Sequence, residues 1–181
     1  MKHIILAGTS RSGKTMLSLE LSKLGYAHYK LDSIKRGIYG NFVEEDGHKW
    51  EEVSPRIAKL IKQMLADYKT DTIYQEEYYL IDTCHLFPKD ALLLKSDDCM
   101  IIFLGYTDVT LEEEMENLKL YDKNHYWSKC LLEQKELIEA NIQFSYYLKE
   151  ECKKYGFLYY DTGKNRQKVF DEIISMMKDQ M

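Results

Sequence analysis

The sequence feature that most constrains the fold is the stretch GTSRSGKT near the amino terminus. It satisfies the pattern G-x-x-x-x-G-K-[ST] at four fixed positions, Gly8, Gly13, Lys14 and Thr15. The preceding MKHIILA is a short, isoleucine-rich apolar run, which predicts a buried strand. Apolar residues then recur at helical spacing as far as Leu24, which predicts a helix. A chance match in a glycine-containing turn would not explain this strand–loop–helix setting.

A loop of this kind can bind phosphate groups for physical reasons. Its glycines let the backbone curl so that N–H groups point inward, and the helix amino terminus adds partial positive charge. The Lys14 ammonium would reach the β- and γ-phosphates, and the Thr15 hydroxyl would be a ligand of Mg²⁺. We therefore expect the loop to bind ATP with Mg²⁺ through Gly8, Thr9, Ser10, Arg11, Ser12, Gly13, Lys14 and Thr15.

The remainder of the chain alternates strands with helices. After the first strand, apolar runs predict strands at 27–32, 77–83, 99–106 and 157–163, and helical patterns lie at 110–121, 128–155 and 166–178. Such alternation indicates an α/β fold with a parallel sheet and helices on both faces. We expect one domain over residues 1–181, with insertions at about 37–67 and 119–130.

The first insertion contains a further predicted helix whose start the sequence leaves open. Ser54 followed by Pro55 is typical of a helix start, with the hydroxyl as cap and proline in the first turn. The helix could equally begin one turn earlier, at Trp50. In both cases it continues through Leu65.

Composition excludes several classes of protein. The net charge of −5 and only four arginines argue against nucleic acid polymers as partners. The four cysteines are widely spaced, which favours free thiols in a reducing cytosol. No signal peptide or membrane-spanning run is evident. We expect a cytoplasmic protein, monomeric or homodimeric, with a small-molecule partner and no membrane contact.

The GTSRSGKT loop and the element order resemble the P-loop small-molecule kinases, which include nucleoside monophosphate, shikimate and gluconate kinases. This resemblance covers nearly the whole chain in element order, but only the loop is a specific motif. It implies a three-layer P-loop NTPase fold with a five-stranded parallel sheet of order 2-3-1-4-5, a helical lid and a substrate-binding insertion. It also implies that Thr162 and Gly163 contact the adenine through main-chain atoms.

Asp82 closes the third predicted strand, YYLID. In a P-loop protein such a residue lies beside the metal and holds it, usually through water. The competing interpretation is an ordinary strand-terminating aspartate. GTP hydrolysis is not indicated, because Asp82 is followed by TCH rather than x-x-Gly, and no Asn-Lys-x-Asp occurs near the fifth strand.

Residues between the second and third strands are candidates for holding the acceptor. In the resembled kinases an acidic residue after the second strand faces the acceptor, and an arginine just beyond it binds an anionic group. Asp32 would then orient or deprotonate a hydroxyl, and Arg36, with Arg56 as a second candidate, would bind a carboxylate or phosphate. A surface ion pair between Asp32 and Arg36 is the alternative.

The predicted lid departs from the pattern of monophosphate kinases, which place arginines there. This chain has no arginine between Arg56 and Arg166. Lys119 and Lys123 could supply charge, but lysine offers a point charge rather than a fork. A solvated helix end is an equal alternative for them.

Cys84 and His85 are adjacent, but two neighbouring residues without further ligands at suitable spacing favour a structural histidine over a metal site. Together these features predict ATP- and Mg²⁺-dependent transfer of the γ-phosphoryl group to a small, anionic, hydroxyl-bearing metabolite, with Lys14, Asp32 and Asp82 as the catalytic residues. The alternatives are a nucleoside or nucleotide kinase, and a regulatory protein that binds ATP without transferring phosphate.

Overall fold

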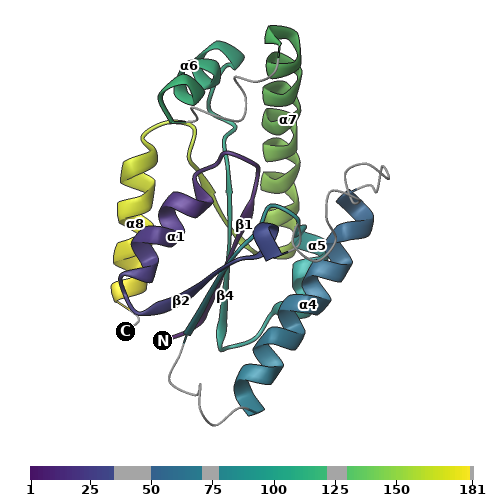
Figure 1. The fold of residues 1–181 in the computed structure, drawn as a ribbon, viewed down its shortest axis with the longest axis vertical. Helices are drawn as coiled ribbons and strands as arrows, with labels where there is room; N and C mark the ends of the chain where they lie inside the picture. Colours follow the sequence, from purple (N-terminus) through teal and green to yellow (C-terminus); the bar gives the residue numbers. More distant parts are fainter. Residues whose placement is uncertain (35–49, 71–77, 122–129, 180–181) are drawn as a thin grey trace.

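The computed structural model describes residues 1–34, 50–70, 78–121 and 130–179. Its centre is a sheet of five parallel strands in the order β2-β3-β1-β4-β5, as predicted (Figure 1). The strands are β1 (His3–Gly8), β2 (Tyr26–Lys30), β3 (Tyr78–Asp82), β4 (Cys99–Gly105) and β5 (Leu158–Asp161).

All six residues of β1 are buried, because this strand lies at the centre of the sheet. Its register pairs Leu6 with Asp82 of β3, and Gly8 with Leu104 of β4. Since the strands are parallel, their carboxyl ends meet at one edge of the sheet. The loop of residues 8–15 (the phosphate loop) therefore lies at that edge. Asp82 and the segments that follow β2, β4 and β5 share the same edge.

Helices cover both faces of the sheet, which gives three layers (Figure 1). Helices α1 (Lys14–Ser22) and α8 (Arg166–Lys178) pack on one face, where Leu17, Leu21, Phe170 and Ile173 are buried against the strands. The other face carries α4 (Trp50–Thr70), α5 (Pro88–Ala91), a 3₁₀ turn, η1 (Leu92–Leu94), and α7 (Leu131–Tyr155).

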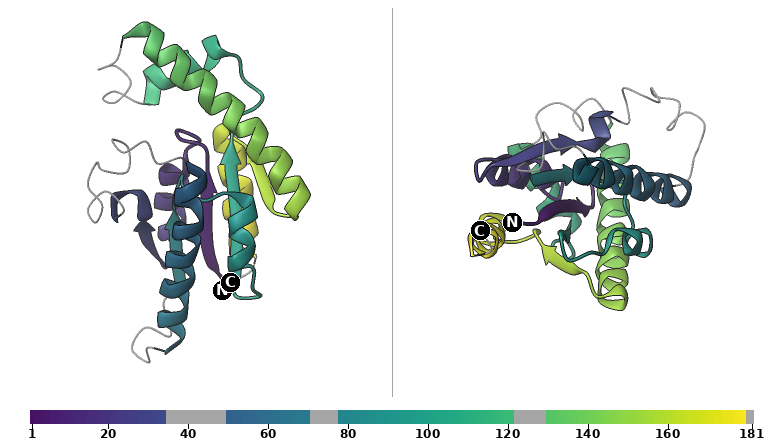
Figure 2. Two further views of the ribbon diagram at one scale, coloured as in Figure 1. Left: turned by 90° about the vertical axis from the view of Figure 1, so that its right-hand side faces the viewer. Right: turned by 90° about the horizontal axis from the view of Figure 1, so that it is seen from below.

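Helix α6 (Leu111–Tyr121) packs on α7 beyond the carboxyl edge of the sheet. Figure 2 shows α6 and the first half of α7 extending past this edge, while both termini lie at the opposite end of the molecule. No helix within the described ranges is long and apolar enough to cross a membrane.

One boundary differs from the sequence-based expectation, and another decides between the two helix starts that the sequence left open. Strand β2 ends at Lys30, and Leu31–Ile34 form a helical turn, so Asp32 belongs to that turn rather than to the strand end. Helix α4 begins at Trp50, which makes Ser54 an interior residue. The Ser54 hydroxyl does not cap the helix, because it donates to Asp90 and accepts from the Phe87 N–H.

The predicted insertions are described in part. Most of α4 falls within the first insertion, and residues 119–121 of α6 begin the second. Residues 37–49 and 122–129 lie outside the described residues.

Candidate active site

The phosphate loop contains three residues with left-handed backbone angles. Gly8, Arg11 and Gly13 have φ values of 132°, 67° and 88°. At Gly8 a Cβ atom would lie 1.9 Å from the Leu104 carbonyl oxygen, so no other residue fits there. The loop can therefore run close against β4 before it turns into α1.

Side chains from three later segments of the chain hold the loop in place. The Thr9 hydroxyl is 2.8 Å from that of Ser145 on α7, and the Tyr106 hydroxyl donates to the Ser10 carbonyl over 3.0 Å. Thr162, after β5, donates its hydroxyl to the Ser12 carbonyl over 2.9 Å. Thr9, Ser12 and Thr162 are fully buried. Their side chains thus stabilise the conformation of the loop.

Lys14 begins α1 and is only 6% exposed. Its ammonium group donates to the carbonyl oxygens of Gly8 and Thr9, at 3.0 and 2.6 Å. Burial lowers the pKa of Lys14, and electrostatic interactions with nearby acidic groups oppose this shift, namely Cys84, Asp32 and Asp82. These three groups therefore face Lys14 from the ends of the neighbouring strands.

Asp82 is 1% exposed at the end of β3. One carboxylate oxygen, Oδ2, lies 3.0 Å from Nε2 of His28 on β2. The other, Oδ1, is buried without a hydrogen-bond partner among the described residues. An unpaired buried carboxylate oxygen is costly unless it faces a cation or a cation-bound water. Together with the half-buried Thr15 in the first turn of α1, Asp82 fits a Mg²⁺ site.

Asp32 is held by the segment that follows β3. Its carboxylate accepts hydrogen bonds from the Thr83 hydroxyl at 3.0 Å, the His85 ring at 2.9 Å and the Cys84 N–H at 3.3 Å. Burial alone raises the pKa of Asp32, but the interactions with His85, Lys14 and Cys84 outweigh burial and hold it well below the usual range. The carboxylate is therefore fixed and ionised near the phosphate loop.

The remaining predicted acceptor and lid residues are only partly described by the structure. Arg36 and Lys123 lie outside the described residues. Arg56 is exposed on α4. Lys119 is exposed on α6 and forms an ion pair with Glu116 of the same helix, which favours the solvated helix end over a lid function.

Thr162 and Gly163 follow β5 beside the loop. The Thr162 N–H donates to the Gly105 carbonyl, and the Gly163 N–H donates to Asp161 Oδ1 at 3.0 Å. These bonds fix the segment on which the adenine contact was predicted. The contact itself stays a prediction.

Two residues near the site were not identified from the sequence. His28 lies on β2, and its role depends on the pairing of β2 with β3, which no local pattern encodes. Arg166 begins α8, and its Cδ atom would be 3.3 Å from a Cβ at Gly13, so it lies against the phosphate loop. The only sequence feature that indicates Arg166 is its position shortly after Thr162 and Gly163, which are predicted to contact the nucleotide.

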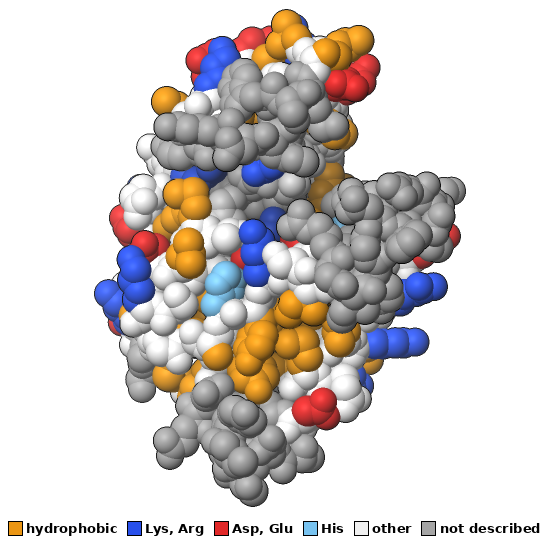
Figure 3. All heavy atoms as spheres, in the orientation of Figure 1, with side chains coloured by type: hydrophobic (Ala, Val, Ile, Leu, Met, Phe, Trp, Pro, Cys, Tyr) orange, Lys and Arg blue, Asp and Glu red, His pale blue; other side chains and the backbone are white. Residues whose placement is uncertain are grey.

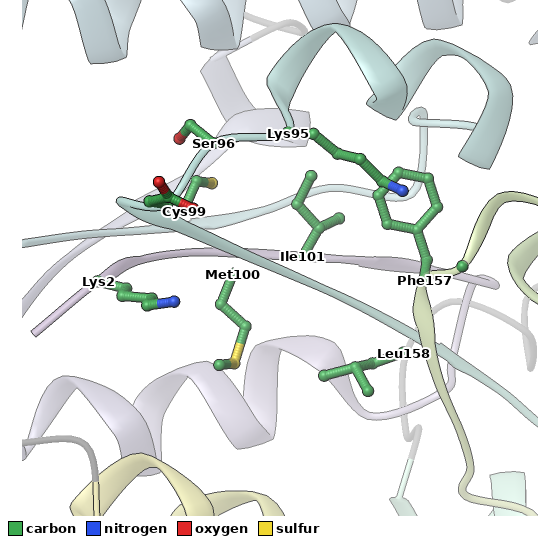
Figure 4. A pocket seen from close by; sticks show the side chains of 10 residues that line it. Lys2, Lys95, Ser96, Cys99, Met100, Ile101, Phe157 and Leu158 are labelled. Atoms are coloured by element: carbon green, nitrogen blue, oxygen red, sulfur yellow. The ribbon is translucent and has the colours of Figure 1, made fainter.

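A separate pocket of about 470 Å³ lies at the opposite edge of the sheet (Figure 4). It is lined by residues at the amino ends of strands and helix ends, among them Lys2, Lys95, Cys99, Phe157 and Leu158. No residue of the candidate site lines it. The polar groups that suit phosphate chemistry are therefore at the other end of the molecule.

No protein-family model matches the sequence, and no curated protein matches it by sequence. Among solved structures, shikimate kinase from Bacteroides thetaiotaomicron is similar with a TM-score of 0.61 and 15% identity, over 99% of this chain and 97% of that chain. This protein has the fold of a P-loop kinase. Deoxyadenosine kinase from M. mycoides is also similar, with a TM-score of 0.55 and 14% identity, over 99% of this chain and 100% of that chain. The strand order 2-3-1-4-5 and the surrounding helices agree with this fold.

Proposed function

We propose that this protein is an ATP- and Mg²⁺-dependent kinase that transfers the γ-phosphoryl group to a small, anionic, hydroxyl-bearing metabolite. The observation that carries the proposal is the convergence of Lys14, Asp32 and Asp82 at one edge of the sheet, beside a loop shaped by Gly8 and Gly13. Phosphoryl transfer depends mainly on positioning and on charge stabilisation, and this arrangement can supply both.

The nucleotide would be held by the phosphate loop. Main-chain N–H groups and the amino end of α1 favour the β- and γ-phosphates. The Lys14 ammonium would exchange its two carbonyl partners for phosphate oxygens. Thr15 and Asp82 would hold Mg²⁺, which neutralises charge on the phosphates when it is bound.

The acceptor would be positioned by Asp32. A carboxylate whose pKa is held well below the usual range is a weak base, so its role is to accept a hydrogen bond from the acceptor hydroxyl and orient it. Arg36 and Arg56 are the proposed partners of the acceptor's anionic group, because a guanidinium group binds carboxylate or phosphate in a bidentate manner.

Arg11 and Arg166 can supply the positive charge that arginines of the lid would otherwise provide. Arg11 lies within the phosphate loop and acts electrostatically on Lys14, and Arg166 lies against Gly13. We propose that they supply positive charge at the nucleotide from the body of the protein.

A nucleoside or nucleotide kinase is the second candidate. It is favoured by the likeness to deoxyadenosine kinase, which covers both chains in full or nearly so. An ATP-binding protein without transferase activity is the third candidate. The fixed and ionised Asp32 carboxylate counts against it, because the proposed binding of Mg²⁺ and ATP uses the loop, Thr15 and Asp82 and does not require Asp32.

The deciding experiment measures ADP formation from ATP and Mg²⁺ with a panel of acceptors: hydroxy acids, sugar acids, nucleosides and nucleoside monophosphates. A hydroxy acid or sugar acid that stimulates turnover supports the proposal, and a nucleoside or nucleotide that does so supports the second candidate. A Lys14→Met variant is the control, since it keeps the side-chain stem and removes the charge. Nucleotide binding without turnover on any acceptor would contradict both kinase proposals.

The proposed partner is a small molecule rather than a polymer. On the described part of the face drawn in Figure 3, lysine and arginine side chains lie in several separate places and acidic side chains are also present, so this part has no continuous basic surface. A nucleic acid backbone requires such a surface. A cytoplasmic location and a monomeric or homodimeric state remain part of the proposal.

A further inference from the structure

Three side chains at the acceptor end of the site bring different ligand atoms together. Asp32, Cys84 and His85 each offer one such atom, and these atoms all lie within 4.8 Å of one another. His85 Nδ1 is 2.9 Å from Asp32 Oδ1 and 3.3 Å from Cys84 Sγ. All three residues are half-buried, so solvent ions can reach a group that the protein already holds together.

The donor set is one that a thiophilic metal prefers. Zn²⁺ binds thiolate sulfur at about 2.3 Å, and imidazole nitrogen or carboxylate oxygen at about 2.0–2.2 Å. In a tetrahedral site these lengths separate neighbouring donors by about 3.3–3.8 Å, so only small side-chain movements are needed here. Mg²⁺ prefers oxygen ligands, which assigns it to Thr15 and Asp82 instead.

The backbone around the three ligands is fixed by further hydrogen bonds. The Cys84 N–H donates to both oxygens of Asp32 at 3.3 Å, and the His85 N–H donates to the Thr83 hydroxyl at 3.1 Å. Thr83 is fully buried. Partners of this kind orient metal ligands and increase affinity. The ligands also come from the ends of two adjacent strands, so their separation is set by the sheet.

We propose that Asp32, Cys84 and His85 form a binding site for Zn²⁺ or a similar thiophilic divalent ion. Binding places the metal between the three side chains and releases the Cys84 thiol proton to solvent. It also takes the Asp32 carboxylate away from the acceptor hydroxyl, so the ion inhibits phosphoryl transfer in competition with the acceptor. The inhibition rests on the proposed kinase function, whereas metal binding does not.

Metal binding is tested with Co²⁺ alone, added to the purified full chain. A cobalt–thiolate bond produces charge-transfer absorption in the near ultraviolet, which reports the cysteine ligand directly. We expect one Co²⁺ per chain with this absorption, and displacement of Co²⁺ by Zn²⁺. The absorption should disappear in Cys84→Ser, and the Co²⁺ affinity should fall about 10- to 100-fold or more in His85→Gln.

Cys99→Ser is the matched control. Cys99 is also half-buried, but it begins β4 at the opposite edge of the sheet. Its variant should bind Co²⁺ as the parent does. Absorption that persists in Cys84→Ser, an unchanged Co²⁺ affinity in His85→Gln, or no absorption in the parent would overturn the metal site. Circular dichroism establishes that each variant is folded.

Inhibition is then measured with the acceptor that the panel identifies. Zn²⁺ should raise the apparent KM for the acceptor and leave the KM for ATP nearly unchanged. An equal effect on both substrates would overturn the competitive mechanism. If no acceptor is found, the kinase proposal fails while the cobalt spectrum still decides the metal site, so the two failures are distinguishable.

Discussion

The two carboxylate oxygens of Asp82 lie in different environments. Its Oδ2 is held by His28, and its Oδ1 is buried and lacks a partner among the described residues. The histidine fixes the rotation of the carboxylate, so the unpaired oxygen keeps one direction. Groups that orient a metal ligand in this way affect metal affinity almost as strongly as the ligand itself.

Replacing His28 with Phe should weaken Mg²⁺ binding without changing the fold of the loop. We expect the Mg²⁺ concentration for half-maximal ATP binding to rise about 10- to 100-fold, because the Asp82 carboxylate loses its orienting partner. Titration calorimetry of ATP at several Mg²⁺ concentrations measures this change. His28→Gln retains a donor and should restore part of the affinity. Mg²⁺ titrations that coincide for His28→Phe and the parent would show that the histidine is only structural.

Some candidate residues are predicted from a local sequence motif, whereas others can be identified only once the pairing of the strands is known. Lys14 and Thr15 follow from GTSRSGKT, and Asp82 follows from a strand that ends in a carboxylate. The contact of His28 with Asp82 exists only because β2 lies beside β3. Spacing alone disfavours a metal site at Cys84 and His85, because the proposed third ligand, Asp32, is more than fifty residues away in the sequence.

At the scale of elements, a buried serine links helix α4 to the segment after β3. Ser54 on α4 donates to Asp90 on α5 over 2.6 Å and accepts the Phe87 N–H over 2.8 Å. Because Ser-Pro is a typical helix start, a cap by this hydroxyl is one of the two starts that the sequence allows for α4. The tertiary contacts override that local preference, because they satisfy two polar groups in the interior.

Ser54→Ala should therefore lower the free energy of unfolding by about 1–3 kcal/mol, because a buried N–H loses its acceptor. Urea denaturation followed by circular dichroism measures the change. Ser96→Ala is the control, since Ser96 is exposed, and we expect its effect to stay within about 0.5 kcal/mol. Equal stability of Ser54→Ala and the parent would mean that water replaces the hydroxyl.

Helix α6 contains a buried acidic residue whose ionised form is disfavoured by its burial. Glu114 is fully buried, its Oε1 has no hydrogen-bond partner among the described residues, and burial raises its pKa. The folded protein therefore holds the proton more tightly than the unfolded chain. Its contribution to stability is complete below the unfolded pKa of about 4.3 and is lost as the pH rises through the folded pKa.

Glu114→Gln should remove the decrease in stability that accompanies ionisation of the buried carboxyl group. We expect the variant to be more stable than the parent at neutral pH and to show a weaker decline of stability as the pH rises from about 4.3. Urea denaturation at a series of pH values tests the difference. Glu112→Gln, on the exposed side of the same helix, should follow the parent curve. A larger stability of the parent at neutral pH would show that the ionised carboxylate has a favourable partner.

For the whole molecule, the order of the strands was predictable because resemblance to a known architecture supplied it, while periodicity supplied only the parallel α/β class. The β1 strand is buried throughout, and its apolar run identified it correctly. The insertions were less predictable, since a helix in an insertion takes its position from the core that it packs on. Helix α4 contacts the core through Ile57, Ala58 and Ile61, and these contacts position it on the sheet.

Nucleotide binding to the phosphate loop should stabilise the whole domain against unfolding. The phosphate loop is held by β4, α7 and the segment after β5, so a ligand on the loop is linked to unfolding of the complete domain. At a Mg²⁺–ATP concentration one hundred times the dissociation constant, the gain is about 2.7 kcal/mol. For a chain of this length, that corresponds to a rise in Tm of about 5–10 °C. Thermal unfolding is measured with Mg²⁺–ATP, with ATP and a chelator, and with no nucleotide. We expect the Tm to be highest with Mg²⁺–ATP, lower with ATP and a chelator, and lowest with no nucleotide. Lys14→Met should lose most of the shift, and the same shift in that variant would place the nucleotide away from the loop.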